Sequence, residues 1–297
     1  MTDSPRSALL GATLAAFATF FPAQPGRAEQ VTGPFADPSR IVAVGGSITE
    51  IVYALGEEKR LVARDTTSVY PEAAFSLPDV GYMRRLSPEG VLSVGPSAIL
   101  ALEGSGPKEA IDVLKKASVP YFEIPERFDR DGILDKVRLV GKALGVDAKA
   151  EALAASVGAD LDAAVAETAA IPERKRVVFV MSNQGGKLLA AGRNTAADGI
   201  IRLAGATNVV DAFEGYKQLT DEALVEAQPD FILMMDRGDG ADPSAEVFAH
   251  PAVAATPAGQ ERRLVRMDGA FLLGFGPRTA AAARDLARSL YGDQATD

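Results

Sequence analysis

A short pattern occurs twice in this chain, and it constrains the fold more than any other feature of the sequence. Residues 86–100 read LSPEGVLSVGPSAIL, and residues 219–233 read LTDEALVEAQPDFIL. Both copies start with Leu and a Ser or Thr, carry Glu at the fourth position, and end with Pro, two variable residues and Ile-Leu, without a gap. Because one supersecondary unit that recurs at a distance indicates repeated architecture, the chain is predicted to hold two similar lobes. Two lobes that face each other would form a cleft, where ligands bind.

The composition fits two folded lobes and excludes several classes of protein. The chain has 297 residues, enough for two domains of about 100–200 residues each. Its net charge of −9 argues against a nucleic-acid-binding protein. It has no cysteine and a single histidine, His250, so disulfides, thiolate metal sites and most zinc sites are excluded. No nucleophile elbow accompanies His250, so the chain is not expected to be an enzyme such as a hydrolase.

The N-terminus has the pattern of a secretory signal peptide. Arg6 precedes an apolar stretch at residues 8–21. A membrane anchor is the alternative, but this stretch is shorter than the ~20 residues that a spanning helix needs, and prolines follow it directly. We therefore expect residues 1–28 to be a signal peptide that is cleaved near Ala28, with no membrane insertion of the mature chain.

Strand and helix patterns alternate along the chain. This alternation is typical of a parallel sheet with helices on its faces. The expected strands lie at residues 40–44, 61–63, 98–102, 119–124, 176–181, 231–234 and 264–267. The first helix is expected to start in a capping box, SITE, at residues 47–50. Residues 147–168 are rich in alanine, the best helix former, and are expected to form a long helix that bridges the two halves.

These patterns divide the chain into lobes. We expect an N-terminal lobe at residues 39–127, a helical linker at residues 128–171, and a C-terminal lobe at residues 172–297.

Gly-Tyr pairs precede both copies of the repeat, and the first pair is a candidate for chemistry. Tyr82 lies in a Gly-Tyr-x-Arg sequence, in a loop expected at the carboxyl end of a strand, where open α/β sheets bind ligands. A phenol with a pKa near ~10 becomes a good anionic ligand only beside a strong positive charge. Ferric iron supplies one, and haem iron accepts tyrosine as an axial ligand. Arg84 and Arg85 could hold the phenolate or meet the carboxylates of a ligand.

The alternative for this loop is that Tyr82 is a packing residue and that both arginines are solvated. In the second copy, Tyr216 mirrors Tyr82 and could line the opposite wall of the cleft. Arg193 and Arg278 lie in loops and could meet anionic groups, although loop arginines are more often solvated. His250 precedes a proline and is expected to be structural.

Glu89 and Glu222 are the equivalent acids of the two copies. Each lies in the first turn of an expected helix, just after a Ser or Thr that can serve as the N-cap. One interpretation is stabilisation of the helix dipole, worth roughly 0.3–1 kcal/mol. The other is that each lobe exposes one carboxylate to arginines of a partner protein.

The chain resembles the periplasmic haem-binding proteins of bacterial ABC haem importers, within the wider vitamin B12- and siderophore-binding class. The resemblance covers essentially the whole mature chain. Four motifs carry it, DTTS at 65–68, VGYMRRLSPEG at 80–90, AAGRNTAA at 190–197 and LGFGPRT at 273–279.

The resemblance implies a fold, a function and a location. The fold is α/β, with two Rossmann-like lobes that have mainly parallel sheets and are joined by one long α-helix, as in class III periplasmic binding proteins. The function is iron acquisition: the protein would capture haem b as its transported ligand and deliver it to the permease and ATPase of an ABC transporter. The location would be the periplasm, and the protein would be a monomer. The alternative is that the same fold binds a ferric siderophore or a corrinoid.

The resemblance also assigns residues. Tyr82 would ligate the haem iron and Arg84 would support it, while Glu89 and Glu222 would dock on the permease. Some relatives carry a histidine on the second lobe as a further haem ligand, but residues 182–184 read Ser-Asn-Gln, so this ligand is not expected.

The two copies of the repeat differ at the position of the supporting arginine. The second copy is preceded by Gly-Tyr-Lys-Gln at residues 215–218, which lacks it. This difference favours Tyr82 over Tyr216 as the iron ligand.

Overall fold

The computed structural model describes the whole chain apart from residues 2–32, 239, 241 and 293–297. Apart from Met1, the predicted signal peptide therefore lies outside the described residues. Within the described residues, no helix is both long and apolar enough to cross a membrane.

The first lobe is built on a four-stranded parallel sheet with the order β2-β1-β3-β4. Its elements are β1 (Ile41–Val44), α1 (Gly46–Ala54), the 3-10 helix η1 (Glu58–Arg60), β2 (Leu61–Arg64), the 3-10 helix η2 (Glu72–Ser76), α2 (Pro88–Ser93), β3 (Ala98–Leu102), α3 (Lys108–Lys116) and β4 (Tyr121–Ile124). The central strands β1 and β3 are fully buried, because helices cover both faces of the sheet.

The second lobe is built on a mixed six-stranded sheet with the order β10-β9-β5-β6-β8, and β7 pairs with β5. Its strands are β5 (Arg176–Gln184), β6 (Lys187–Ala191), β7 (Thr207–Asn208), β8 (Tyr216–Leu219), β9 (Phe231–Asp236) and β10 (Leu264–Asp268). Its helices are α6 (Ala196–Leu203), α7 (Asp221–Ala227), α8 (Ser244–Phe248), α9 (Pro251–Ala254), α10 (Pro257–Gln260), α11 (Gly269–Leu273) and α12 (Thr279–Tyr291). The parallel strands are β10, β9, β5 and β7, while β6 and β8 form an antiparallel extension.

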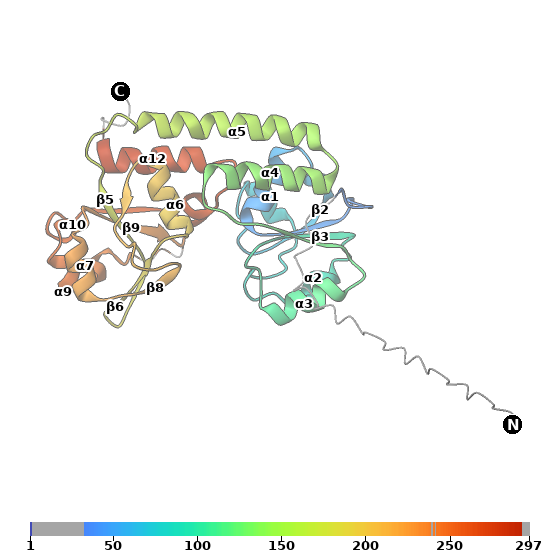
Figure 1. Cartoon of the computed structure of the whole chain (residues 1–297), viewed down its shortest axis with the longest axis horizontal. Coiled ribbons are helices and arrows are strands. Elements are labelled where there is room, and N and C mark those ends of the chain that lie inside the picture. Colours follow the sequence, from blue (N-terminus) through green and yellow to red (C-terminus); the bar gives the residue numbers. More distant parts are fainter. Residues whose placement is uncertain (2–32, 239, 241, 293–297) are drawn as a thin grey trace.

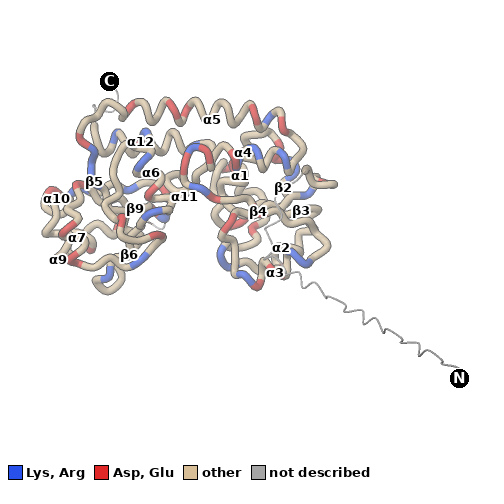
Figure 2. Tube along the Cα trace, in the orientation of Figure 1, with Lys and Arg blue, Asp and Glu red and all other residues tan. Residues whose placement is uncertain are grey.

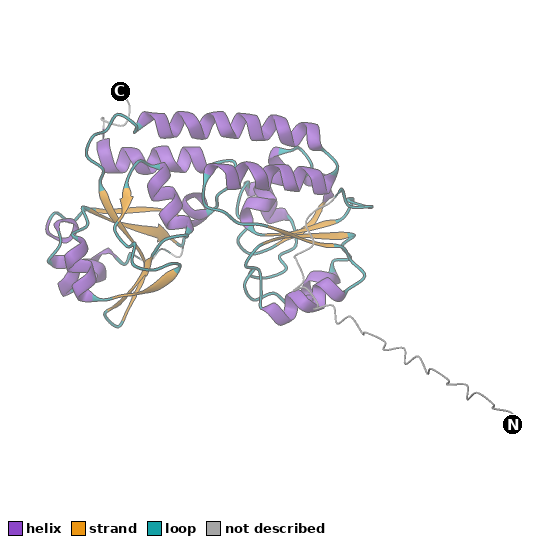
Figure 3. Ribbon diagram, in the orientation of Figure 1, coloured by secondary structure: helices purple, strands orange, loops and turns teal. Residues whose placement is uncertain are grey.

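A helical layer joins the two sheets. Helix α4 (Arg130–Leu144) packs against α5 (Asp147–Glu167), and α5 also packs against α12. The 21 residues of α5 span about 30 Å, so this single helix runs above both lobes (Figures 1 and 3). Its buried face repeats at three- and four-residue spacing, at Ala150, Ala154, Val157, Leu161 and Ala164. The predicted α/β architecture, two lobes joined by one long helix, is confirmed.

One hydrophobic core runs through the first lobe, the helical layer and one face of the second sheet. A second, smaller core covers the other face of the second sheet. Strand β5 shows the division, because Val177 and Phe179 belong to the first core while Val178 and Val180 belong to the second. Since the larger core is continuous between the lobes, their relative position is held by packing as well as by the connecting chain.

The repeat forms the same local unit in both lobes. Ser87 and Thr220 accept hydrogen bonds from the backbone N–H groups of Gly90 and Ala223, which caps α2 and α7. The strands β3 and β9 then follow. The segments that precede the copies differ, because Tyr82 lies in a loop whereas Tyr216 begins strand β8.

The predicted capping box of the first helix is wrong. Helix α1 begins at Gly46, and its N-cap residue, Gly45, makes no side-chain cap bond. The Glu50 carboxylate instead accepts hydrogen bonds from the backbone and from Nε of Arg278, at 3.1 and 3.0 Å. The Glu50 carboxylate therefore forms an ion pair with the second lobe and does not cap helix α1.

Candidate ligand site between the lobes

Exposed aromatic residues gather on the first lobe. Tyr70, Phe75 and Tyr82 are 44%, 55% and 37% exposed, and within the described residues they are the aromatic side chains classed as exposed. All three lie in the segment between β2 and α2, with Phe75 inside the 3-10 helix η2 and both tyrosines in its loops. Because a soluble protein seldom exposes grouped aromatic rings without a partner, this segment is a candidate ligand wall.

The DTTS motif anchors the start of these loops. Asp65 is completely buried, and its carboxylate accepts hydrogen bonds from the N–H of Gly45 at 3.0 Å and the hydroxyl of Ser68 at 2.8 Å. The backbone N–H and hydroxyl of Thr67 also donate to it, at 3.0 and 2.8 Å. Asp65 thereby ties the β2 loop to the turn after β1, so this motif builds the scaffold of the wall.

Tyr82 is presented at the end of a tight turn. Gly81 has a φ of +99°, a conformation that favours glycine, and its N–H donates to Oδ1 of Asp79 at 2.8 Å. The Gly81 carbonyl accepts from the N–H of Thr66 at 3.0 Å. Within the described residues, the hydroxyl of Tyr82 makes no hydrogen bond. The turn is therefore ordered while the phenol oxygen remains available to a ligand.

Arg84 of the first lobe lies near Tyr216 of the second lobe. It and Arg85 are exposed and form no ion pair with any described carboxylate. The guanidinium of Arg84 lies close enough to Tyr216 to favour the phenolate form of that residue. The expected contact between Arg84 and Tyr82 is not made within the described part of the chain, so that role stays a prediction.

Tyr216 has a different environment from Tyr82. Burial raises the pKa of the Tyr216 phenol, and Arg84, the Ala197 backbone and the Thr195 side chain oppose that rise. Its ring meets Phe179 edge-on, with centroids 6.4 Å apart. The Tyr216 phenol is therefore partly covered, and burial disfavours its ionisation.

The AAGRNTAA motif positions the segment next to Tyr216. A Cβ atom on Gly192 would lie 2.2 Å from the Phe213 carbonyl oxygen, so only glycine fits this crossing. Thr195 caps α6 by accepting from the N–H of Asp198 at 3.1 Å. Arg193 is exposed and only loosely paired, with 3.8 Å between its Nη2 atom and the carboxylate of Glu214. Its charge is available to an anionic group.

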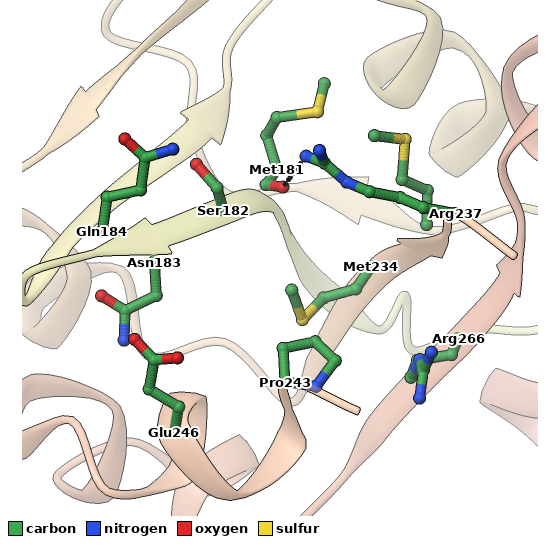
Figure 4. Close-up of a pocket in the computed structure, with 10 residues that line it drawn as sticks. Met181, Ser182, Asn183, Gln184, Met234, Arg237, Pro243, Glu246 and Arg266 are labelled. Atoms are coloured by element: carbon green, nitrogen blue, oxygen red, sulfur yellow. Dashed lines mark hydrogen bonds between the residues drawn. The ribbon is translucent and has the colours of Figure 1, made fainter. Parts of the chain in front are cut away.

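A pocket of about 250 Å³ lies at the carboxyl ends of β5, β9 and β10 (Figure 4). It is lined by Met181, Ser182, Asn183, Gln184, Met234, Met235, Arg237, Pro243, Glu246 and Arg266. Nη2 of Arg237 donates to the Met181 carbonyl at 3.2 Å, and Arg266 pairs with Asp236 and Asp242 at 3.2 and 3.1 Å. Arg237 was not among the residues predicted from the sequence, although its place just after an expected strand is a signal that could have found it.

The two acids of the repeat lie on the side of the molecule opposite α5. Helices α2 and α7, which carry Glu89 and Glu222, occupy this side on different lobes (Figure 2). Both residues are exposed. The Ser87 hydroxyl donates to the Glu89 carboxylate at 2.8 Å and lowers the pKa of Glu89. Glu89 is therefore charged at neutral pH and exposed.

His250 is a structural residue. It is 6% exposed, and its Nε2 atom lies 2.9 Å from the Gly186 carbonyl oxygen and 3.7 Å from the Asp221 carboxylate. Within the described residues, no group of three His, Cys, Asp or Glu side chains could hold a metal ion. A protein-bound metal centre of the usual kind is thus not formed by these residues.

Comparisons with known proteins agree with this architecture. A family model described as a periplasmic binding protein matches residues 41–270. The periplasmic haem-binding protein BhuT, solved in complex with two haems, is 42% identical with a TM-score of 0.79, over 86% of this chain and 99% of that one. An uncharacterised ABC transporter substrate-binding lipoprotein of Bacillus subtilis, YvrC, is 28% identical over 86% of this chain and 81% of its own length. A cobalamin-binding protein of Halobacterium salinarum is 26% identical over 73% of this chain and 59% of its own length.

Proposed function

Because this chain belongs to the periplasmic binding protein family, we propose that it captures haem b between its lobes and delivers it to an ABC transporter. Proteins of this family bind a substrate for transport and catalyse no reaction, so the chain is a binding protein and not an enzyme. The observation that carries haem as the ligand is the group of exposed aromatic rings after β2, at Tyr70, Phe75 and Tyr82. Such rings suit the apolar face of a macrocycle.

Tyr82 is the proposed iron ligand. Its phenol is exposed and free of protein hydrogen bonds within the described residues, whereas Tyr216 is partly covered and burial raises its pKa. A ferric ion stabilises the phenolate of an accessible tyrosine, which then serves as an axial ligand. Tyr216 contributes its ring to the opposite wall.

Arginines would meet the carboxylates of the ligand. Arg84 and Arg193 are exposed on opposite lobes, and neither makes a close ion pair with a described carboxylate. Arg237, which lines the pocket of the second lobe, is a further cation on that side. Guanidinium groups suit this task because they bind carboxylates through two parallel hydrogen bonds.

The loaded protein would dock on the permease through Glu89 and Glu222. One exposed acid on each lobe, both on the side away from α5, supports a two-point contact with a basic partner surface. The permease and ATPase of an ABC transporter are therefore the proposed partners, and a monomer suffices for this contact.

Export precedes this function. The similarity to a substrate-binding lipoprotein supports passage through the membrane, and we propose that residues 1–28 direct it and that the mature protein works in the periplasm. Within the mature chain we take residues 39–127 and 172–297 as the two lobes and residues 128–171 as the helical linker.

The second candidate ligand is a corrinoid, because a cobalamin-binding protein is among the relatives. Ferric siderophores fall in the same class of substrates. Haem is favoured because BhuT, at 42% identity, is much more similar to this chain than the cobalamin-binding protein, at 26%.

Titration with haemin, followed by visible absorption, tests the proposal. A saturable change with the high-spin signature of a tyrosinate ligand is expected, and cyanocobalamin should not compete. Tyr82→Phe should remove that signature, while Tyr70→Phe, which changes the other exposed tyrosine of the same wall, should keep it. If the purified protein binds cobalamin but not haemin, haem is not its transported ligand. If Tyr82→Phe keeps the tyrosinate spectrum of bound haemin, Tyr82 is not the iron ligand.

A further inference from the structure

Arg64 is a buried cation at the base of the aromatic wall. It ends strand β2, and only 7% of the residue is exposed. Arginine is seldom buried to this extent unless its charge and hydrogen-bond donors are satisfied. Here Nε donates to the Ala74 carbonyl at 3.1 Å, while Nη1 donates to the Asp65 carbonyl at 3.0 Å. Nη1 also donates to the Asp79 carboxylate at 3.1 Å.

One side of this guanidinium holds Phe75. The Ala74 carbonyl that accepts from Nε belongs to the residue directly before Phe75. The Arg64 guanidinium carbon lies 5.1 Å from the centre of the Phe75 ring, within the range of a cation–π contact. Arg64 thus fixes both the backbone and the ring of the most exposed aromatic residue of the wall.

The other side holds the turn of Tyr82. Oδ2 of Asp79 accepts from Arg64, which leaves Oδ1 to accept from the N–H of Gly81 at 2.8 Å and the hydroxyl of Thr66 at 3.2 Å. The backbone adds a short parallel bridge, in which the N–H of Arg64 donates to Pro78 and its carbonyl accepts from Val80, each at 2.9 Å. Arg64 is therefore connected through one carboxylate to the residue that precedes Tyr82.

We propose that Arg64 is a positioning residue that fixes Phe75 and Tyr82 relative to each other, so that an apolar macrocycle face and its metal ion are met together. The inference rests on the proposed function of this wall. It follows from the fork geometry of arginine, whose donors point in fixed directions and can hold two segments at once. Ordering both side chains before the ligand arrives removes a cost that binding would otherwise carry.

The ligand class follows from this arrangement. A flat apolar surface beside one anionic oxygen donor recognises a planar metal macrocycle with an open axial position. A macrocycle whose metal is already six-coordinate would gain only the apolar contact. Arg64 should therefore matter more for haemin than for a metal-free porphyrin, in which the Tyr82 phenol has no metal to bind.

A thermodynamic cycle tests the role of Arg64. Arg64→Met should weaken haemin binding by ~10–100-fold, the usual effect of removing a group that orients a metal ligand. It should also alter the tyrosinate spectrum of the bound form. Binding of metal-free protoporphyrin should fall less. In a Tyr82→Phe, Phe75→Ala background, Arg64→Met should weaken haemin binding by less than about threefold, because the side chains it positions are gone.

Arg60 provides the matched control. It ends the 3-10 helix η1, directly before strand β2. It also binds a carbonyl and a carboxylate, those of Leu144 at 2.8 Å and Glu57 at 2.7 Å. Arg60→Met should leave the haemin spectrum unchanged. If Arg64→Met folds poorly, Asp79→Asn tests the Tyr82 side alone, because the Asp79 side chain is 39% exposed and its loss perturbs the core little. That variant should change the tyrosinate spectrum and weaken binding.

The outcomes separate this inference from the proposed function. The positioning role is overturned if Arg64→Met binds haemin normally. It is also overturned if Arg64→Met weakens haemin binding equally in the wild-type and in the double-variant backgrounds. Neither outcome affects the proposed function, which depends on haemin binding by the wild type and on the Tyr82→Phe spectrum. For a poorly folded Arg64→Met, an unchanged spectrum of Asp79→Asn overturns the positioning role. A wild-type protein that does not bind haemin overturns both proposals.

Discussion

Lys136 is a fully buried charge at the junction of the two lobes, and its removal should be costly. Its amino group donates to the Glu126 carboxylate at 2.5 Å and to the Ser47 hydroxyl at 3.2 Å. It also donates to the Phe275 carbonyl of the second lobe at 3.0 Å. Burial lowers the pKa of Lys136 and raises that of Glu126, and their direct contact opposes both changes.

Lys136→Met keeps an unbranched side chain that is one atom shorter, and it removes the charge and all three donations. The Glu126 side chain, 13% exposed, then lacks its cation. Breaking a buried ion pair from one side typically costs ~3–5 kcal/mol in the free energy of unfolding. The ion pair between Arg130 and Asp162 serves as the control, because its side chains are 41% and 58% exposed. Arg130→Met should cost far less free energy of unfolding, because solvent and salt screen an exposed ion pair.

Urea unfolding followed by far-UV circular dichroism measures these differences. The loss in Lys136→Met should also depend on pH. Without the ammonium group, the pKa of Glu126 in the folded state rises further above its unfolded value of ~4.3. A carboxyl whose pKa is higher in the folded state adds to the free energy of unfolding at a pH below its unfolded pKa. This contribution is lost as the pH rises through its folded pKa. The loss relative to wild type should therefore be smaller near about pH 5 than near about pH 7.5.

A second substitution isolates the cause. Lys136→Met combined with Glu126→Gln should recover part of the lost free energy, because no unpaired carboxylate remains buried. If Lys136→Met costs no more than Arg130→Met at neutral pH, or costs the same at both pH values, the unpaired Glu126 carboxylate is not the cause of the loss.

Three further predictions concern packing, the second tyrosine and docking. Gly192→Ala should lower the free energy of unfolding by ~1–3 kcal/mol in urea unfolding, because the new Cβ would meet the Phe213 carbonyl. Tyr216→Phe should leave the tyrosinate spectrum of bound haemin intact, because its phenol is partly covered and burial raises its pKa. Glu89→Ala with Glu222→Ala should abolish haem-dependent growth or uptake while haemin affinity in titration stays within about twofold.

Each of these has a matched control. Gly33→Ala should be neutral, since nothing lies within 4 Å of its new Cβ. Equal costs for the two glycine variants would contradict the packing argument. Loss of the tyrosinate band in Tyr216→Phe would assign the iron to the second lobe. Glu109→Ala with Glu226→Ala changes two other exposed acids, one on each lobe, and equal loss of uptake would show that overall charge, not docking, is responsible.

Local signals in the sequence were sufficient for most strands. Strand β3 begins and ends at the residues expected from pattern alone, and Ser87 and Thr220 cap their helices as expected. These features depend on hydrogen bonds within three or four residues and on the spacing of apolar side chains, both of which can be read along the chain. The capping box at Glu50 failed for the opposite reason, because its competitor, Arg278, lies 228 residues away.

The sequence by itself determined two similar α/β lobes, the alanine-rich helix that joins them, and Tyr82 as the leading candidate for a ligand contact. Only the tertiary structure decided the environments of the two tyrosines that follow Gly81 and Gly215. Tyr82 stays exposed on an ordered turn, while Tyr216 enters a strand and is covered beside Phe179. Burial and charge are set by neighbours from distant parts of the chain, and neither quantity is encoded in a short motif.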